Sequence, residues 1–228
     1  IGERESIKDV SKVLSRFIDC IAIRTYDHKT VIELADSSSV PVINALSDYT
    51  HPCQALTDLY TIKEKKGSLD NVNLAYVGDG NNVARSLAFL CAKLKVSCTI
   101  ASPENYELSA QFLNELENNV IGKDSYIKQI RDPREAVKGA DVIYTDTWIS
   151  MGEEEEAEAR RQDFKGFQVN NELISYAKKD VFVMHCLPAH RGEEITDDVI
   201  DGEHSIVYDQ AENRLHVQKA LLKLLISG

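Results

Sequence analysis

From Asn71 onward, short apolar runs alternate with stretches in which apolar residues follow a helical period. Strands and helices that alternate along a chain predict a parallel sheet covered by helices. The predicted strands lie at 72–77, 97–101, 126–130, 141–145, 181–185 and 205–208, and the predicted helices at 82–94, 106–118, 133–138, 171–178 and 211–226. This part of the chain is therefore expected to form an α/β domain.

The first 66 residues show the same alternation on a smaller scale. Helices and strands are predicted, in order, at 5–17, 21–23, 30–36, 40–45 and from Pro52 to about 65. Gly67 and Ser68 then mark a helix stop. We expect two parallel-sheet α/β domains, the first only partly present. The expected units are 1–66, 67–208 and a C-terminal helix at 209–228 that packs back on the first domain.

Composition narrows the classes of partner. The 228 residues include 37 acidic and 26 basic side chains, a formal net charge of -11. This charge repels nucleic acid and anionic membranes, although a local Arg and His cluster can still bind a small anion. No apolar run approaches the roughly 18 residues of a membrane-spanning helix. Five cysteines without a C-x-x-C pair favour reduced thiols in a cytoplasmic protein over disulfides or a metal site.

Four polar segments fall at the predicted C-terminal ends of strands, where open α/β sheets bind their ligands. They are Arg24, 78–82, 146–152 and 185–188. Because unrelated loops need not share one edge of a sheet, their common position indicates a site more strongly than any one segment does.

His51-Pro52-Cys53-Gln54 begins a predicted helix, whose free N–H groups and positive dipole end suit an anion. His51 can donate to a carbonyl or phosphate oxygen there, and Gln54, one turn later, is expected to add an amide donor. The alternative for a lone His-Pro pair is a histidine that caps its own helix.

Gly78-Asp79-Gly80-Asn81-Asn82 follows a strand as a dinucleotide-binding loop does. However, Val83 replaces the third glycine, and no acidic residue ends the next strand, so a nicotinamide enzyme is disfavoured. We interpret the loop as a turn that directs asparagine side chains toward a small polar ligand. A plain strand-to-helix turn is the alternative.

Asp146 ends a predicted strand and can pair with a ligand ammonium, while Ser150 and the backbone of Met151 can bind a carboxylate. A locally capped turn is the alternative. The acidic run that follows, Glu153 to Glu156, is interpreted as a solvated face, with a mobile lid as the minor alternative.

His185 and Cys186 are adjacent on a predicted strand, so their side chains should point to opposite faces. This argues against a thiol hydrolase built on the pair and leaves Cys186 as a buried thiol. Arg214, near the start of the last helix, either reaches the same cleft or is solvated.

Taken in order, four segments resemble the ornithine carbamoyltransferases, over residues 3–226. They are His51-Pro52-Cys53-Gln54, Asp146 with Ser150-Met151-Gly152, His185-Cys186-Leu187-Pro188 and Ala211-Glu212-Asn213-Arg214. The Ser-Met-Gly loop separates the ornithine enzymes from the aspartate carbamoyltransferases, which share His-Pro-x-Gln. The family's early Ser-x-Arg-Thr phosphate loop does not occur in the chain. We expect it upstream of Ile1, within roughly 80 further residues, and expect the 228-residue piece alone to be inactive and poorly folded in its first 66 residues.

The resemblance implies a role for each matched residue. The carbamoyl phosphate ligands it implies are Arg24, His51, Gln54, Cys186, Leu187 and Arg214. The ornithine ligands are Asn82, Asp146, Ser150 and Met151. The catalytic set is Arg24, His51, Asp146, Cys186 and Arg214.

The resemblance also implies the reaction. The carbamoyl group of carbamoyl phosphate would pass to the δ-amine of L-ornithine, giving L-citrulline and phosphate in arginine or urea-cycle metabolism. It implies a cytoplasmic trimer with active sites between subunits, and no metal or cofactor. The alternatives are a carbamoyltransferase for putrescine or N-acetylornithine, and a catalytically inactive regulatory homologue.

Overall fold

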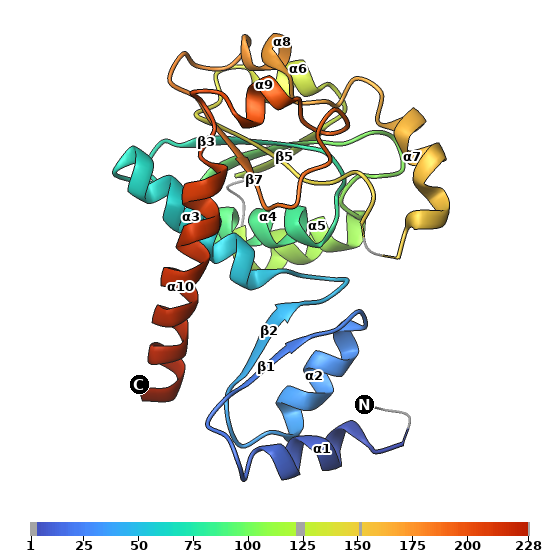
Figure 1. The fold of residues 1–228 in the computed structure, drawn as a ribbon, viewed down its shortest axis with the longest axis vertical. Coiled ribbons are helices and arrows are strands. Elements are labelled where there is room, and N and C mark those ends of the chain that lie inside the picture. The colour runs from blue at the N-terminus through green and yellow to red at the C-terminus, as the bar shows by residue number, and fades with distance from the viewer. Residues whose placement is uncertain (1–3, 122–125, 151, 228) are drawn as a thin grey trace.

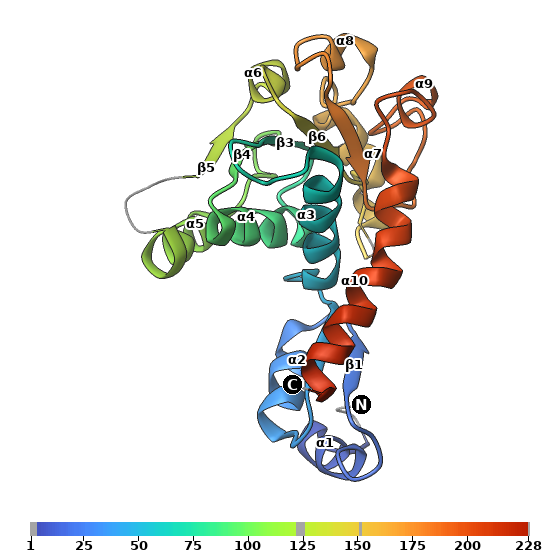
Figure 2. The same ribbon diagram turned by 90° about the vertical axis from the view of Figure 1, so that its left-hand side faces the viewer.

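The computed structural model describes residues 4–121, 126–150 and 152–227, which form a small and a large lobe (Figures 1 and 2). The small lobe contains two parallel strands and two helices, in the order α1 (Ile7–Leu14), β1 (Ile21–Arg24), α2 (His28–Ser37) and β2 (Val42–Leu46). Its buried apolar residues come from β1, α2 and β2, and Ser11 of α1 donates to the Leu34 carbonyl at 2.8 Å. Helix α3 (Pro52–Lys66) then leads into the large lobe.

The large lobe is built on one parallel sheet with the order β5-β4-β3-β6-β7. Its strands are β3 (Asn73–Val77), β4 (Ser97–Ala101), β5 (Ile127–Ile130), β6 (Val142–Thr145) and β7 (Phe182–His185). Its helices are α4 (Asn82–Leu94), α5 (Ala110–Leu116), α6 (Pro133–Val137), α7 (Ala157–Asp163), α8 (Asn171–Ile174), α9 (Asp197–Ile200) and α10 (Val207–Ser227), with a π-helical turn at Glu117–Ile121 and a 3₁₀ turn at Glu154–Glu156. The α/β class predicted from the sequence is therefore confirmed.

Strand side chains supply two cores, one on each face of this sheet. Leu74 and Tyr76 of β3 pack with α3, α4 and α5, whereas Ala75 and Val77 pack with α6, α8 and α9. This alternation follows from the two-residue period of a strand. The direction of strand addition reverses between β3 and β6, and such a switch point leaves a crevice beyond the strand ends.

Three features differ from the sequence prediction. The predicted strand at 205–208 is wrong: Ser205 forms a single bridge to Val183, and helix α10 begins at Val207. The apolar residues Ile206 and Val207 are buried because they enter the core at the start of that helix. Helices α7 and α9 were not predicted.

No helix within the described ranges is both long and apolar enough to cross a membrane.

Candidate active site

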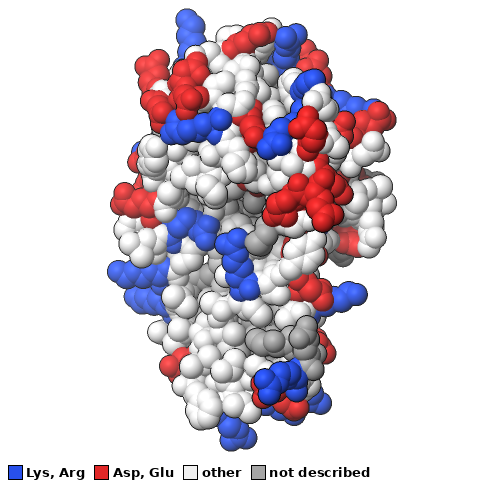
Figure 3. Space-filling view, turned by 45° about the vertical axis from the view of Figure 1, so that its right-hand side comes forward, with Lys and Arg blue, Asp and Glu red and all other residues white. Residues whose placement is uncertain are grey.

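A cavity of about 950 Å³ opens where the two lobes meet, beyond the C-terminal ends of β1, β3 and β6. Its size is typical of a small-molecule site. Figure 3 shows basic side chains gathered at the middle of this side of the molecule, beside an acidic cluster. The cavity thus lies at the switch point of the large sheet, within reach of residues from the small lobe.

Nine of the ten predicted site residues line this cavity. They are Arg24, His51, Gln54, Asn82, Asp146, Ser150, Cys186, Leu187 and Arg214. The tenth, Met151, lies outside the described residues. Residues 160 positions apart in the sequence therefore meet at one cavity, although their individual roles stay predictions.

His51 precedes α3 but does not cap it with its side chain, so the alternative of a self-capping histidine does not hold. Its backbone N–H donates to Ser86 Oγ at 2.8 Å, and its Nδ1 is buried without a partner among the described residues. Burial, and then the charges of Arg214 and Arg24, lower the pKa of His51 to about 4. Near neutral pH the ring is uncharged in a locally positive field, and it can donate one hydrogen bond to a ligand oxygen.

Gln54 presents a different group from the one predicted. Its amide nitrogen donates to Asp58 Oδ1 at 2.8 Å, while its Oε1 accepts from the Arg214 guanidinium. The amide nitrogen thus faces Asp58, which does not line the cavity, instead of a ligand as the sequence prediction has it. Gln54 instead holds its carbonyl oxygen beside Arg214, another residue of the cavity wall.

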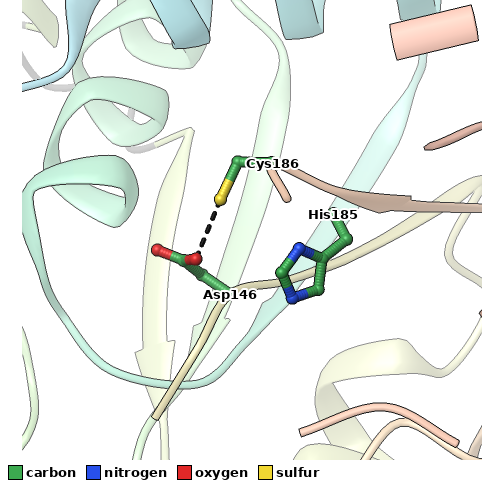
Figure 4. A group of neighbouring side chains, drawn as sticks. All are labelled: Asp146, His185 and Cys186. Carbon is green, nitrogen blue, oxygen red and sulfur yellow. Dashed lines mark hydrogen bonds between the residues drawn. The ribbon is translucent and has the colours of Figure 1, made fainter. Parts of the chain in front are cut away.

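Asp146 and Cys186 form the other side of the cavity. The Cys186 thiol points at the Asp146 carboxylate (Figure 4). Asp146 accepts from the Asn81 amide at 2.8 Å, from the Thr147 N–H at 2.8 Å and from the Cys186 thiol at 2.8 Å. Burial, and then the nearby Asp146 carboxylate, raise the pKa of Cys186 well above its usual value. A protonated thiol that donates to a carboxylate is a poor nucleophile, which argues against thiolate catalysis here.

His185 belongs to a separate, fully buried network. Its Nδ1 accepts from the Leu187 N–H at 2.9 Å, and its Nε2 lies 3.1 Å from Glu194 Oε1. Because a ring nitrogen that accepts cannot also carry the proton, the Nε2–H must donate to Glu194. Both nitrogens are thereby occupied. His185 approaches Asp146 and Cys186 closely enough for a metal site, but it has no lone pair left to bind a metal ion.

The loop after β3 is a tightly packed turn. A side chain at Gly80 would place its Cβ 2.6 Å from the Leu108 nitrogen, and the Gly80 N–H donates to the Tyr106 carbonyl at 2.7 Å. Asn81 caps α4 through its Oδ1 and donates to Asp146, and Asn82 donates to the Ser47 carbonyl at 2.7 Å. Asn82 therefore joins the two lobes at the cavity, whereas Asn81 orders the large-lobe side, and the Gly80 N–H is not free for a phosphate.

A buried arginine fixes the loop that carries Ser150. Arg160 of α7 pairs with Asp79 and lies 3.1 Å from Glu153, whose carboxylate accepts from the Ser150 N–H at 2.9 Å. Burial raises the pKa of Asp79 to about 6, although Arg160 opposes this. Glu154 and Glu156 are exposed as predicted, but Glu153 is held in this network.

Gln210 of α10 joins two of these networks, because it donates to Asp58 and accepts from the His185 backbone N–H. Four residues of these networks had no signal in the sequence. They are Asp58, Arg160, Glu194 and Gln210. A single polar residue within a helix or loop is normally solvent-facing, so only its burial in the folded chain identifies it.

Comparison with known proteins covers both lobes. The carbamoyl-P binding domain of the aspartate/ornithine carbamoyltransferase family matches residues 1–64, and the Asp/Orn binding domain of that family matches residues 70–225. A protein of Pyrococcus abyssi described as ornithine carbamoyltransferase is 55% identical over 224 residues, covering 98% of this chain and 71% of that protein.

Two solved structures show the same arrangement. The ornithine carbamoyltransferase from Pyrococcus furiosus has a TM-score of 0.94 at 54% identity, and the match covers 100% of this chain and 72% of that one. The anabolic ornithine carbamoyltransferase from Campylobacter jejuni has a TM-score of 0.93 at 38% identity, covering 99% and 75%. The similarity thus extends over the whole cavity wall.

Proposed function

The chain belongs to the aspartate/ornithine carbamoyltransferase family, and we propose that its cavity binds carbamoyl phosphate and L-ornithine side by side. The reaction is transfer of the carbamoyl group to the δ-amine of ornithine, which yields L-citrulline and phosphate. The observation that carries this proposal is the meeting of both predicted residue sets at one cavity between two lobes.

On the carbamoyl phosphate side, Arg24 and neutral His51 donate to the carbamoyl carbonyl oxygen, with Arg214 adding positive charge. The field that lowers the His51 pKa supports this role, since the same two arginines would stabilise a developing oxyanion. The carbonyls of Cys186 and Leu187 accept from the carbamoyl NH₂ and the incoming amine. Leu187 has a positive φ of 55°, and its N–H is fixed by His185, so this turn is held rigidly.

On the ornithine side, Asp146 binds the α-ammonium group, and Asn82, Ser150 and Met151 bind the rest of the amino-acid end. The neutral δ-amine attacks the carbamoyl carbon, the bond to the phosphate oxygen breaks, and the departing phosphate takes up the proton that the amine releases. Placing the two reactants together can contribute ~7–11 kcal/mol toward the barrier. No covalent intermediate on the protein is required.

We further propose the division into 1–66, 67–208 and 209–228. The matched domain ranges, 1–64 and 70–225, support the boundary near residue 67, and the second range also includes most of the last helix. A cytoplasmic location is consistent with five unpaired cysteines. A trimer in arginine biosynthesis follows from the family resemblance, and relatives described as anabolic support the biosynthetic direction.

An acceptor assay tests the function. With carbamoyl phosphate as donor, citrulline should form from ornithine, while putrescine and N-acetylornithine should give little product because neither offers a free amino-acid end. Asp146→Asn should lower kcat/KM for ornithine by roughly 10- to 100-fold, the usual loss when a hydrogen bond to a charged group is weakened. Equal use of putrescine and ornithine by the wild type would contradict the assignment.

A further inference from the structure

One buried carboxylate lies outside the cavity wall, yet it binds a residue that lines the cavity, Gln54. Asp58 of α3 is fully buried and is not part of the cavity wall. Its Oδ1 accepts from Gln54 Nε2 at 2.8 Å and from Gln210 Nε2 at 2.7 Å. A buried carboxylate costs free energy, so a helix that retains one invites an explanation.

The hydrogen-bonding partners leave only one orientation for each glutamine. Gln54 lies between Arg214, which can only donate, and the Asp58 oxygen, which accepts, so its Oε1 must face Arg214. Gln210 lies between the His185 backbone N–H, which donates to its Oε1 at 3.0 Å, and the same Asp58 oxygen. These orientations follow from the donor and acceptor inventory alone.

The orientation of Gln54 determines what it offers a ligand. Its amide nitrogen faces Asp58, away from the cavity, and its oxygen faces Arg214, which lines the cavity. A side-chain carbonyl has two lone pairs, of which Arg214 occupies one. The group left for a ligand at this position is therefore an acceptor.

We propose that Asp58 is a positioning residue that locks Gln54 with its carbonyl oxygen toward the cavity, so that the site selects a ligand carrying NH₂ next to the reacting carbonyl. This inference rests on the proposed function and deepens it. A carbamoyl group has that NH₂, whereas an acetyl group has a methyl at the same place. A site built to hydrogen-bond a polar group rejects an analogue that lacks it.

The test compares two unreactive ligands that differ at this one position. Phosphonoacetamide carries NH₂ where acetonylphosphonate carries CH₃, and the two have the same charge. By calorimetric titration, the wild type should prefer the amide by roughly tenfold or more, which is ~1.4 kcal/mol. Asp58→Leu should lose most of this preference, because Gln54 then keeps only its contact with Arg214 and its side chain can turn away from the cavity. Asp58→Asn should keep it, since the asparagine Oδ1 still accepts from both glutamines.

The outcomes separate this inference from the proposed function. An unchanged preference in Asp58→Leu, or equal loss in both variants, overturns the positioning role. A wild type that binds neither ligand and forms no citrulline overturns the proposed function itself.

A measurement on the wild type covers the case in which Asp58→Leu does not fold. In ¹⁵N-labelled protein, the Gln54 side-chain NH₂ should be protected from solvent exchange before phosphonoacetamide is added. Protection that appears only on binding would mean that the amide donates to the ligand, and would overturn the proposal.

Discussion

His51 illustrates how its surroundings set the chemistry of one residue. Histidine ordinarily titrates near neutral pH, but burial and two arginines lower its pKa to about 4. The folded protein then binds fewer protons than the unfolded chain between about pH 4 and 6.5. Consequently the contribution of His51 to stability is present above that window and is lost as the pH falls through it.

The pH dependence of the reaction should follow the attacking amine and not His51. We expect kcat/KM for ornithine to rise with pH from 6 to 9, by about tenfold per unit, because an amine like that of lysine has a pKa of about 10.4 and must lose its proton to attack. His51 should add no break near 6.5, since it is already neutral there. Initial rates at subsaturating ornithine check this. A flat profile would count against attack by the free amine.

At this scale, sequence analysis could name residues that belong to a family motif but not their supports. Asp146 and Arg214 were predicted because they recur in an ordered set. Asp58 was not, because an aspartate in a helix is ordinarily solvated. Gln54 lies in the cavity wall, but the sequence could not show which end of its amide faces the cavity, since that orientation depends on Asp58.

At the scale of the element, helix α7 depends on a single buried charge. Arg160 is almost completely buried, donates to the Trp148 carbonyl at 2.5 Å and pairs with Asp79 and Glu153. The acidic segment before it reads as solvent-facing, which is why α7 escaped prediction. The strands β1 to β7 were predictable because their apolar runs are short and bounded by turn residues.

We predict that Arg160→Met lowers the free energy of unfolding by roughly 3–5 kcal/mol, the usual cost of leaving buried carboxylates without their partner. The loss should be smaller at pH 5 than at pH 8, because the Asp79 pKa, already about 6, would rise further and the protonated form would carry no charge. Urea denaturation at both pH values measures this.

The neighbouring Arg161 provides a matched control. It pairs with Glu193 at 3.1 Å on a side chain that is 43% exposed. Arg161→Met should therefore cost no more than about 1 kcal/mol at either pH, as surface ion pairs do. Similar losses for the two variants would show that burial of Arg160 has no energetic role.

At the scale of the whole molecule, the two lobes differ in how much structure supports them. Over the residues that the structure describes, the large lobe has five strands with helices on both faces, whereas the small lobe has two strands and a few buried apolar residues. Helix α10 packs on α3 through Gln210, Asn213 and Arg214, but its last turns expose Leu222, Leu224 and Leu225. A two-stranded sheet has little stability of its own.

This asymmetry predicts the pattern of hydrogen exchange. Amides of β1 and β2 should exchange much faster than those of β3 and β6, because local opening of the small lobe exposes little apolar surface. Arg24 ends β1 and His51 follows β2, so the ligand binds only when the small lobe is folded against the large one. Phosphonoacetamide should therefore slow exchange in β1 and β2. At 100 times its Kd the ligand should stabilise the closed form by ~2.7 kcal/mol, a slowing of about 100-fold. Exchange at β3 and β6 should be slower than at β1 and β2 before the ligand is added. Where it proceeds by global unfolding it should slow by the same factor on binding, because the unfolded chain does not bind the ligand either. Equal exchange in both lobes without ligand, or no slowing in β1 and β2 at saturation, would contradict the idea that the ligand holds the lobes together.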